Sequence, residues 1–136
     1  MRRYRLIEHT ADTGIVAYGK SLPDAFANAA YGLFSIIADL RKIREVEFRR
    51  VELESSDVES LLHDWMNQLI YLFDVEHLIF KRCDIDRLTE RGLQAMCWGE
   101  KYDPSRHRVK IGVKSATYHM LEVNREKNQV RVIFDI

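Results

Sequence analysis

Two segments of the chain carry apolar residues at helical spacing, and each apolar stripe must be covered by another part of the protein. The first segment follows Ser21-Leu22-Pro23-Asp24, where serine can cap a helix and proline loses no backbone hydrogen bond. The second follows Ser56-Asp57-Val58-Glu59, which has the pattern of a capping box. The stripes are Leu22, Phe26, Ala29, Ala30, Leu33 and Ile37, and Val58, Leu61, Leu62, Trp65, Leu69, Leu72 and Phe73. We therefore expect amphipathic helices over residues 21–39 and 56–75.

Most of the remaining chain alternates apolar and polar residues with the period of a β-strand. About seven strands are predicted, drawn from residues 4–9, 15–18, 46–54, 78–88, 93–101, 109–114, 118–123 and 129–136. The alternation changes phase at Arg49-Arg50, which indicates a bulge. Residues 10–14 have the composition of a turn, in which Gly14 can adopt positive φ. Residues 89–92 are predicted to form a hairpin turn.

These elements predict one α+β domain over residues 1–136. Most of the strands follow the helices and are joined by short connections, so the sheet should be mixed and mostly antiparallel. Each helix has a single apolar face, and the economical arrangement places both helices on one face of that sheet. We therefore expect a two-layer α+β sandwich.

The composition excludes several function classes. The 21 basic and 21 acidic residues give a formal net charge of zero, so no overall attraction to nucleic acid or anionic membrane is expected, although a local patch is compatible with this balance. No apolar run reaches the length of a signal peptide or a membrane span, which predicts a soluble cytoplasmic protein that does not bind membranes. Cys83 and Cys97 lie in strand-like segments and are predicted to be reduced, buried thiols. A disulfide between them is compatible with a hairpin but is not implied.

Motifs of independent enzymes are missing from the sequence. It contains no G-x-S-x-G elbow, no phosphate-binding G-x-x-x-x-G-K-[ST] loop and no H-x-x-x-H pair for zinc. His63 and Asp64 are adjacent on the second predicted helix, so we expect them to point in different directions. His63 is expected to be a residue of the polar face or the core edge.

Polar residues gather instead at three predicted strand-to-loop boundaries, where functional sites usually lie. These are His9-Thr10-Ala11-Asp12, the segment 114–119 and the final Asp135-Ile136. Alternation over residues 130–135 places the last residues in a strand, so the Asp135 carboxylate and the terminal carboxylate arrive together. Two such anions repel each other unless a cation compensates them.

If the three segments meet, Asp12, Asp135 and the terminal carboxylate supply at least three anionic oxygens, which suit calcium or magnesium better than zinc or copper. Lys114 could then meet a phosphate or an acidic group of a partner. Three alternatives remain open at this point: Asp12 as a turn former only, Lys114 as a solvated edge lysine, and His119 as an ordinary strand histidine.

The order of several motifs resembles the archease family over essentially the whole chain. The motifs are His9-Thr10-Ala11-Asp12, Ala17-Tyr18-Gly19 with Asp24-Ala25-Phe26, Ser60-Leu61-Leu62-His63-Asp64-Trp65, Val113-Lys114-Ser115-Ala116-Thr117-Tyr118-His119 and Ile133-Phe134-Asp135-Ile136. The sequence departs from the family pattern in two places. Ser115-Ala116 replaces the usual Ala-Val/Ile, and Met120 stands where glycine is frequent. We expect neither departure to affect function.

The resemblance implies a non-enzymatic activator of the GTP-dependent RNA ligase that joins tRNA exons. Such proteins promote guanylylation of the ligase and its multiple turnover, and they meet tRNA only indirectly. The family's divalent cation, reported as calcium, with magnesium or manganese as alternatives, would fall on Asp12, Asp135 and Ile136. The family's functional lysine falls on Lys114, and His9 and His119 are further candidates for contact with the partner.

Two other classes of function are compatible with these residues. The first is a chaperone-like modulator of an RNA methyltransferase or another RNA-processing enzyme, in which the acidic cluster would be purely structural. The second is a metal-dependent hydrolase that uses His9 or His119 as a base. A local acidic site beside a lysine, together with a neutral overall charge, favours the accessory role over both.

Overall fold

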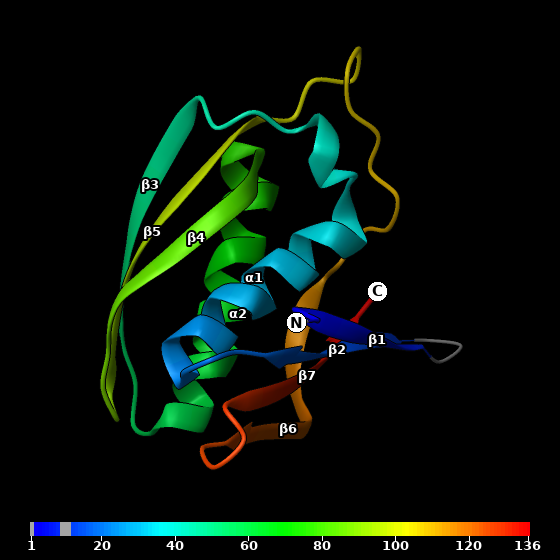
Figure 1. Ribbon diagram of the computed structural model, residues 1–136. Helices are drawn as coiled ribbons and strands as arrows, with labels where there is room; N and C mark the ends of the chain where they lie inside the picture. The colour runs from blue at the N-terminus through cyan, green and yellow to red at the C-terminus, as the bar shows by residue number, and fades with distance from the viewer. Residues whose placement is uncertain (1, 9–11) are drawn as a thin grey trace.

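The computed structural model describes residues 2–8 and 12–136, so His9, Thr10 and Ala11 lie outside the described residues. The elements in chain order are β1 (Tyr4–Glu8), β2 (Asp12–Tyr18), α1 (Leu22–Ile37), the 3-10 helix η1 (Leu40–Lys42), β3 (Glu47–Glu54), α2 (Val58–Glu76), β4 (Leu78–Leu88), β5 (Gly92–Lys101), β6 (Ser115–Asn124) and β7 (Gln129–Asp135). Figure 1 shows their arrangement.

The described strands form two antiparallel sheets with the helices packed against them. The four-stranded sheet has the order β1-β2-β7-β6, and the three-stranded sheet has the order β3-β5-β4. Helix α1 lies against β4 of one sheet and β2 of the other, while α2 packs mainly on β6 (Figure 1). The expected α+β class is thus confirmed, and the strands that the sequence suggested for one sheet are divided between two.

The apolar stripes of both helices form the core, as the spacing predicts. Ser21 caps α1 by accepting the backbone N–H of Asp24 at 3.2 Å. The cap of α2 is Asp57, which accepts the N–H of Ser60 at 2.7 Å, so this helix begins one residue later than the Ser56 cap suggested. Trp65 is fully buried, and its indole N–H donates to the carbonyl of Phe26 at 3.0 Å. This bond joins the two helices inside the core, which satisfies a polar group that burial would otherwise leave unpaired.

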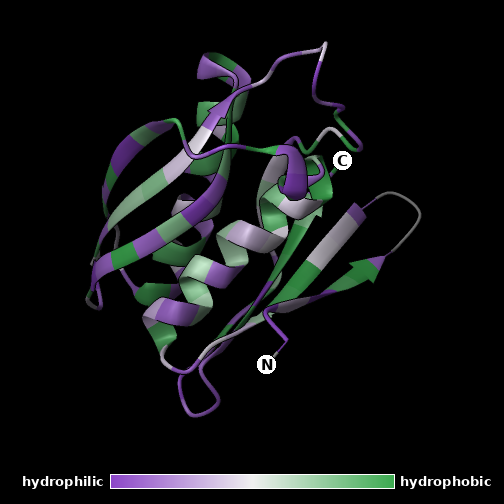
Figure 2. Ribbon diagram, turned by 45° about the horizontal axis from the view of Figure 1, so that its top comes forward, coloured by the Kyte–Doolittle hydropathy of each residue, from purple (hydrophilic) through white to green (hydrophobic). Residues whose placement is uncertain are grey.

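The bulge predicted at Arg49-Arg50 is wrong. β3 pairs with β5 in unbroken register from Glu47 to Glu54. The phase seemed to change because Phe48 faces solvent, whereas Arg49 faces the helices and donates to Glu76 of α2 at 3.0 Å. Figure 2 shows the resulting alternation of hydrophilic and hydrophobic bands along the strands of this sheet. The irregularities in that sheet lie in β4 instead.

Gly14 does not sit in a turn, because β2 begins at Asp12 and no described glycine has positive φ. The glycine permits close packing against β7. A Cβ atom at this position would lie 2.6 Å from Ile133 Cδ1 and 2.7 Å from the carbonyl oxygen of Val132.

Residues 109–114 do not form the predicted strand. Their backbone groups find partners outside any sheet ladder, since Lys110 N–H donates to the carbonyl of Ile37 at 2.7 Å and Lys114 N–H to that of Asp135 at 2.8 Å. The alternation arose because Val113 is buried and Val109 partly buried against the core. A long loop therefore runs from β5 past η1 to β6 (Figure 1).

A buried carboxylate holds the first part of this loop. Glu100, 4 % exposed, accepts two bonds from the Arg106 guanidinium at 2.8 and 3.1 Å. It also accepts the backbone N–H of Arg44 at 2.7 Å. His107 Nδ1 accepts the N–H of Asp103, so its Nε2 carries the proton that faces Glu100 at 3.2 Å. The Glu100 carboxylate thus joins the loop to β5 and to the chain after η1.

The two cysteines are free, buried and directly opposite each other in the β4–β5 pairing, in agreement with the predicted reduced core thiols. Burial raises the pKa of the Cys83 thiol well above its usual value. No helix within residues 2–8 and 12–136 is long and apolar enough to cross a membrane.

Glu100→Gln should destabilise the protein by about 3 kcal/mol at neutral pH, because Arg106 and Arg44 lose a buried anionic partner. Hydrogen bonds from Arg106 are the main cause that lowers the pKa of Glu100 from 4.5 to about 2. The stabilisation is therefore complete above pH 4.5 and is lost as the pH falls toward 2. Urea denaturation of the wild type and the variant at several pH values should show that the difference in their free energies of unfolding decreases over that interval. A difference that does not change with pH would contradict the role of the Glu100 carboxylate.

Gly99→Ala should cost about 2 kcal/mol or more, because the new Cβ would overlap the carbonyl oxygen of Ile79 and lie 2.7 Å from Phe80 Cα. Both neighbours are backbone atoms of the adjacent strand, so the sheet itself would have to move. Gly112→Ala is the matched control, since a Cβ there meets no atom within 4 Å. Thermal denaturation should separate the two variants, and equal midpoints would refute the packing role of Gly99.

Candidate functional site

The three polar segments singled out in the sequence meet at one end of the four-stranded sheet. β2 pairs with β7 so that Asp12 lies directly opposite Asp135. β6 pairs with the other side of β7 so that Ser115 lies opposite the same Asp135. The beginning and the end of the chain are thereby brought together on three adjacent strands, as the sequence suggested.

The three side chains project from the same face of the sheet. Directly opposite residues of paired strands share a face, and successive residues along a strand alternate between faces. Ile15, Phe134 and Ala116 belong to the helix-facing core. Asp12, Asp135 and Ser115 are therefore on the face directed away from α1 and α2.

This juxtaposition leaves negative charge uncompensated. Opposed residues on paired strands have Cβ atoms about 5 Å apart, so two carboxylates in these positions repel each other. Asp12 Oδ1 is buried and has no hydrogen-bond partner among residues 2–8 and 12–136. Asp135 receives one bond from the Ser115 hydroxyl, at a long 3.4 Å. Within the described residues, neither aspartate takes part in an ion pair.

These features fit a hard divalent cation. A buried carboxylate oxygen normally has a hydrogen-bond donor or a metal ion as its partner, and calcium and magnesium take carboxylate oxygens as ligands. No cluster of three or more His, Cys, Asp or Glu side chains forms in residues 2–8 and 12–136. Two carboxylates do not complete the six to eight oxygens that calcium prefers, so main-chain oxygens and water would supply the remainder.

Lys114 is positioned beside this pair by its backbone. Its N–H donates to the carbonyl of Asp135, and the residue is exposed. Ile136 is half-buried and packs against the core, one residue after Asp135.

His119 belongs to a different part of β6. It is exposed and lies in the irregular stretch between Thr117 and Glu122, where the register with β7 shifts. Its backbone N–H meets Thr117 Oγ1 at 3.3 Å, and no described contact links it to Asp12 or Asp135. His9, the other candidate histidine, lies outside the described residues.

One residue that sequence reasoning missed, Asn67 of α2, holds the start of β6. Its side-chain Oδ1 accepts the N–H of Ala116 at 2.8 Å, and its Nδ2 donates to the carbonyl of Ala116 at 3.3 Å. The same Nδ2 faces His63 Nε2 at 3.1 Å. Ser115 was also missed as a site residue. The position of Ser115 next to Lys114 could have suggested it. Asn67 contacts Ala116, 49 residues later in the sequence, and no local sequence pattern could have predicted that contact.

His63 and Asp64 do not point apart as predicted. His63 Nδ1 meets Asp64 Oδ1 at 3.0 Å, and the ring stacks on Tyr118 with centroids 4.0 Å apart. Because Asn67 Nδ2 can only donate, His63 Nε2 accepts and its Nδ1 carries the proton. His63 is therefore a structural residue between α2 and β6 rather than a free base.

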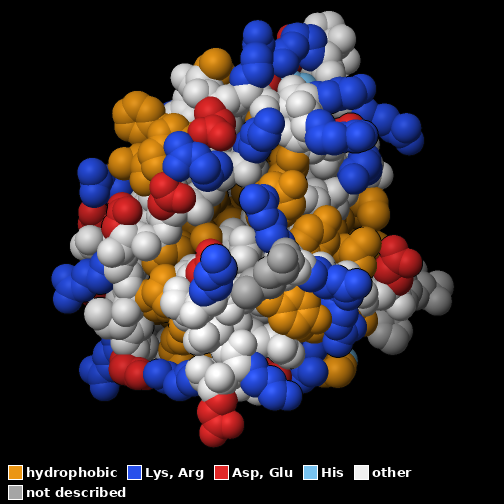
Figure 3. Space-filling view, viewed as in Figure 1, with side chains coloured by type: hydrophobic (Ala, Val, Ile, Leu, Met, Phe, Trp, Pro, Cys, Tyr) orange, Lys and Arg blue, Asp and Glu red, His pale blue; other side chains and the backbone are white. Residues whose placement is uncertain are grey.

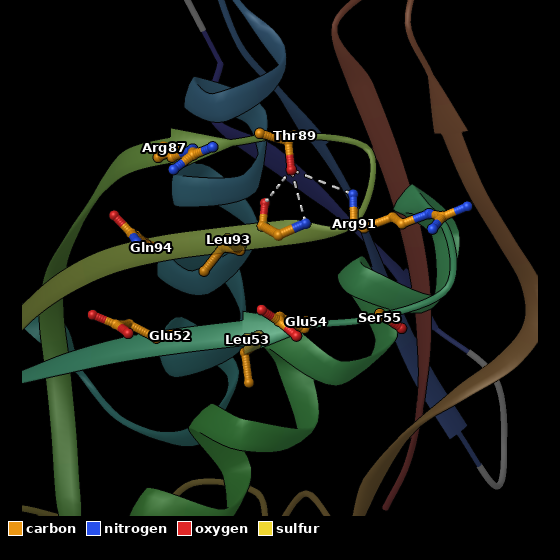
Figure 4. A pocket seen from close by; sticks show the side chains of 10 residues that line it. Glu52, Leu53, Glu54, Ser55, Arg87, Thr89, Arg91, Leu93 and Gln94 are labelled. Carbon is orange, nitrogen blue, oxygen red and sulfur yellow. Dashed lines mark hydrogen bonds between the residues drawn. The ribbon is translucent and has the colours of Figure 1, made fainter.

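A larger hollow of about 710 Å³ lies elsewhere, between β3 and the β4–β5 turn. Figure 4 shows its polar lining of mixed charge, with Glu52 and Glu54 on β3 and with Arg87 and Arg91 on the other side of β5. The hydroxyl of Thr89 is occupied in closing the turn, where it accepts the N–H of Gly92 at 2.9 Å. Ser55, just after β3, also lines this hollow, and its hydroxyl is engaged within the fold because it donates to Asp64 of α2 at 3.1 Å.

Comparison with known proteins decides the family. Residues 4–136 match the model of the "Archease protein family (MTH1598/TM1083)". The chain belongs to the archease family. It is 41% identical to protein archease of Pyrococcus abyssi over 128 residues, which cover 92% of this chain and 90% of the relative.

Solved structures agree with this assignment. The solution structure of Methanobacterium thermoautotrophicum protein 1598 is 32% identical, with a TM-score of 0.81 and complete coverage of both chains. A Thermotoga maritima archease, described as a possible chaperone, has a TM-score of 0.60 at 21% identity, covers 96% of this chain and 94% of its own, and supports the fold.

Calcium should raise the melting temperature of the wild-type protein, because a ligand bound only by the folded state stabilises it by mass action. Asp12→Asn should remove this response. In chelator, the same variant should be at least as stable as the wild type, since one of two opposed charges is gone. Asp86→Asn, an exposed aspartate of β4, is the control and should respond to calcium normally. A calcium response that survives in Asp12→Asn would place the ion elsewhere.

Proposed function

We propose that this archease-family protein activates the GTP-dependent RNA ligase of tRNA splicing, promoting ligase guanylylation and multiple turnover. The observation that carries the proposal is the Asp12–Asp135 pair, presented at a sheet end with an unpartnered carboxylate oxygen and with Lys114 alongside. Such a site suits a module that acts at the active centre of a partner.

Asp12, Asp135 and the terminal carboxylate of Ile136 would hold a divalent cation, with calcium as first candidate and magnesium or manganese as alternatives. Such a cation would supply neutralisation of phosphate charge at the guanylylation site. The chain's own residues orient this end: the β2–β7 pairing fixes both aspartates, and Asn67 fixes the strand that begins beside Lys114. Lys114 would contact a phosphate or an acidic ligase residue.

The proposed role is that of an accessory protein rather than an enzyme. Among the described residues, His63 is engaged with Asp64 and Asn67, and His107 is buried with both ring nitrogens engaged. Neither is therefore available as a base. We place the protein in the cytoplasm with the ligase, where it would require no membrane.

A chaperone-like modulator of an RNA methyltransferase or other RNA-processing enzyme is the second candidate. It is favoured by the description of the Thermotoga relative as a possible chaperone. Such a role would use exposed apolar side chains such as Val46 and Phe48, which are distant in sequence from Asp12 and Asp135. A chaperone of this kind would not depend on Asp12 or Asp135.

Asp12→Ala, Asp135→Ala and Lys114→Ala should each reduce stimulation of ligase guanylylation at least 10-fold while the variants stay folded. The physical reason is the loss of cation ligands or of the adjacent positive charge. The measurement is incorporation of labelled guanylate into the ligase with each activator. Lys127→Ala, an exposed lysine in the β6–β7 turn, should stimulate like the wild type.

An extension of one residue after Ile136 separates the two candidate functions. It should impair calcium binding and guanylylation together if the terminal carboxylate is a ligand. Full stimulation by all three substitution variants would contradict the proposed site, and normal protection of a methyltransferase from aggregation by the same variants would favour the chaperone role.

A further inference from the structure

The neutral net charge of this chain conceals a strongly basic face. Residues 39–45 and 100–114 contain eight of the 21 basic residues but only four of the 21 acidic ones. These two segments are neighbours in space, because Arg106 donates to the carbonyl of Lys42 and Lys110 N–H to that of Ile37. Figure 3 shows the lysine and arginine side chains gathered over this part of the molecule, at the top and upper right.

Three of the four acidic residues in these segments are paired with arginines. Asp39 accepts the backbone N–H and two guanidinium bonds of Arg41, which hold the pKa of its carboxyl at about 2. Glu100 is enclosed by Arg44 and Arg106. Glu45 pairs with Arg82 of β4. Asp103 is held by bonds from Ser105.

Of the basic residues in these segments that have no ion-pair partner in the described chain, three line one hollow. Lys42, Arg108 and Lys110 surround a space of about 200 Å³. The other lining residues are Ala38, Asp39 and His107. Both ring nitrogens of His107 are already engaged, and Asp39 is paired with Arg41. The available charge in the hollow is thus positive, and its volume suits a phosphate group.

The basic face continues to the acidic end of the other sheet. Lys110 and Lys114 are four residues apart on the same irregular segment, a span of at most about 14 Å. Lys114 is joined through its backbone to Asp135. A chain of phosphates bound across the hollow would therefore extend past Lys114 to the Asp12–Asp135 pair.

We propose that the face formed by residues 39–45 and 100–114 binds the sugar–phosphate backbone of RNA, with one phosphate held by Lys42, Arg108 and Lys110. The choice of RNA rests on the proposed function, since RNA ends are the ligase's substrate. The charges act on phosphates and read no bases, so binding is independent of sequence. In this arrangement the accessory protein meets RNA directly instead of only through its partner.

Electrostatic binding of this size is weak and depends strongly on salt. Each single-strand phosphate neutralised contributes about −0.7 to the slope of log affinity against log salt concentration. Three to four contacts therefore give a slope of roughly −2 to −3. We therefore expect this face to be occupied only when the ligase in the same complex already holds the RNA, because the bound ligase raises the local concentration of that RNA.

The test is fluorescence anisotropy of a labelled single-stranded RNA at low salt, titrated with the protein alone. The combined variant Lys42→Gln, Arg108→Gln and Lys110→Gln should bind at least 10-fold more weakly and lose most of the salt slope. The control Lys20→Gln, Arg91→Gln and Lys127→Gln removes the same number and types of charge from exposed positions elsewhere. It should bind within about 2-fold of the wild type.

Competitors identify the chemistry that the hollow recognises. Unlabelled RNA of another sequence should displace the probe, and inorganic phosphate should do so only at far higher concentration. Polyglutamate that competes as well as RNA would overturn the proposal in favour of an acidic protein partner. Equal binding by the two triple variants, or no binding by the wild type at low salt, would also overturn it.

A structural role for the same cations is tested in parallel. Lys42 and Lys110 lie near the C-terminal end of α1, where positive charge stabilises a helix. A lower melting temperature with unchanged RNA binding would assign them that role and refute the proposal. The single variant Arg108→Gln retains both lysines, so it should weaken RNA binding without changing the melting temperature.

Guanylylation separates this inference from the function on which it rests. Guanylylation of the ligase involves no RNA, so the combined variant Lys42→Gln, Arg108→Gln and Lys110→Gln should stimulate this step like the wild type. The same variant should no longer stimulate the joining of RNA ends when the RNA is limiting. Failure of the wild type to stimulate guanylylation would refute the proposed function and leave the RNA-binding result intact. Normal guanylylation without any RNA binding would refute only the inference made here.

Discussion

The antiparallel pairing of β2 with β7 is the constraint on which the rest of the molecule depends. It runs from Asp12–Asp135 to Tyr18–Gln129 without a register shift. Because side chains alternate along a strand, a slip of one residue would turn Ile15 or Phe134 from the core toward solvent. The burial of apolar side chains therefore sets the register, and the register sets which residues meet at the acidic end.

The acidic end opposes the local preferences of a sheet. Two carboxylates lie on opposed positions, and Asp12 Oδ1 is buried without a hydrogen-bond partner in the part of the chain that the structure describes. Such an arrangement persists only because the surrounding strands are held by the helices and by the clamp of Asn67 on Ala116. Departures of this kind concentrate at functional sites, where a ligand supplies the missing interaction.

Charge is segregated within a chain whose total is zero. The anions of the basic face are each held by an arginine or by turn donors, which leaves Lys42, Arg108 and Lys110 for an external anion. The acidic pair at the end of β7 lacks such partners among the described residues. One end therefore suits a cation and the neighbouring face suits phosphates, which is the combination that the proposed function requires.

The sequence by itself determined the α+β class, both helices and the β4–β5 hairpin, because caps and hydrophobic periodicity act over a few residues. The motifs also predicted that Asp12, Lys114 and Asp135 lie together, which the strand pairing bears out, whereas their role as a site stays a proposal. Tertiary structure alone decided that residues 109–114 form a loop, that Arg49 faces inward and that Asn67 holds β6. Each of these depends on a partner distant in the chain, and local periodicity contains no information about which distant group will be near.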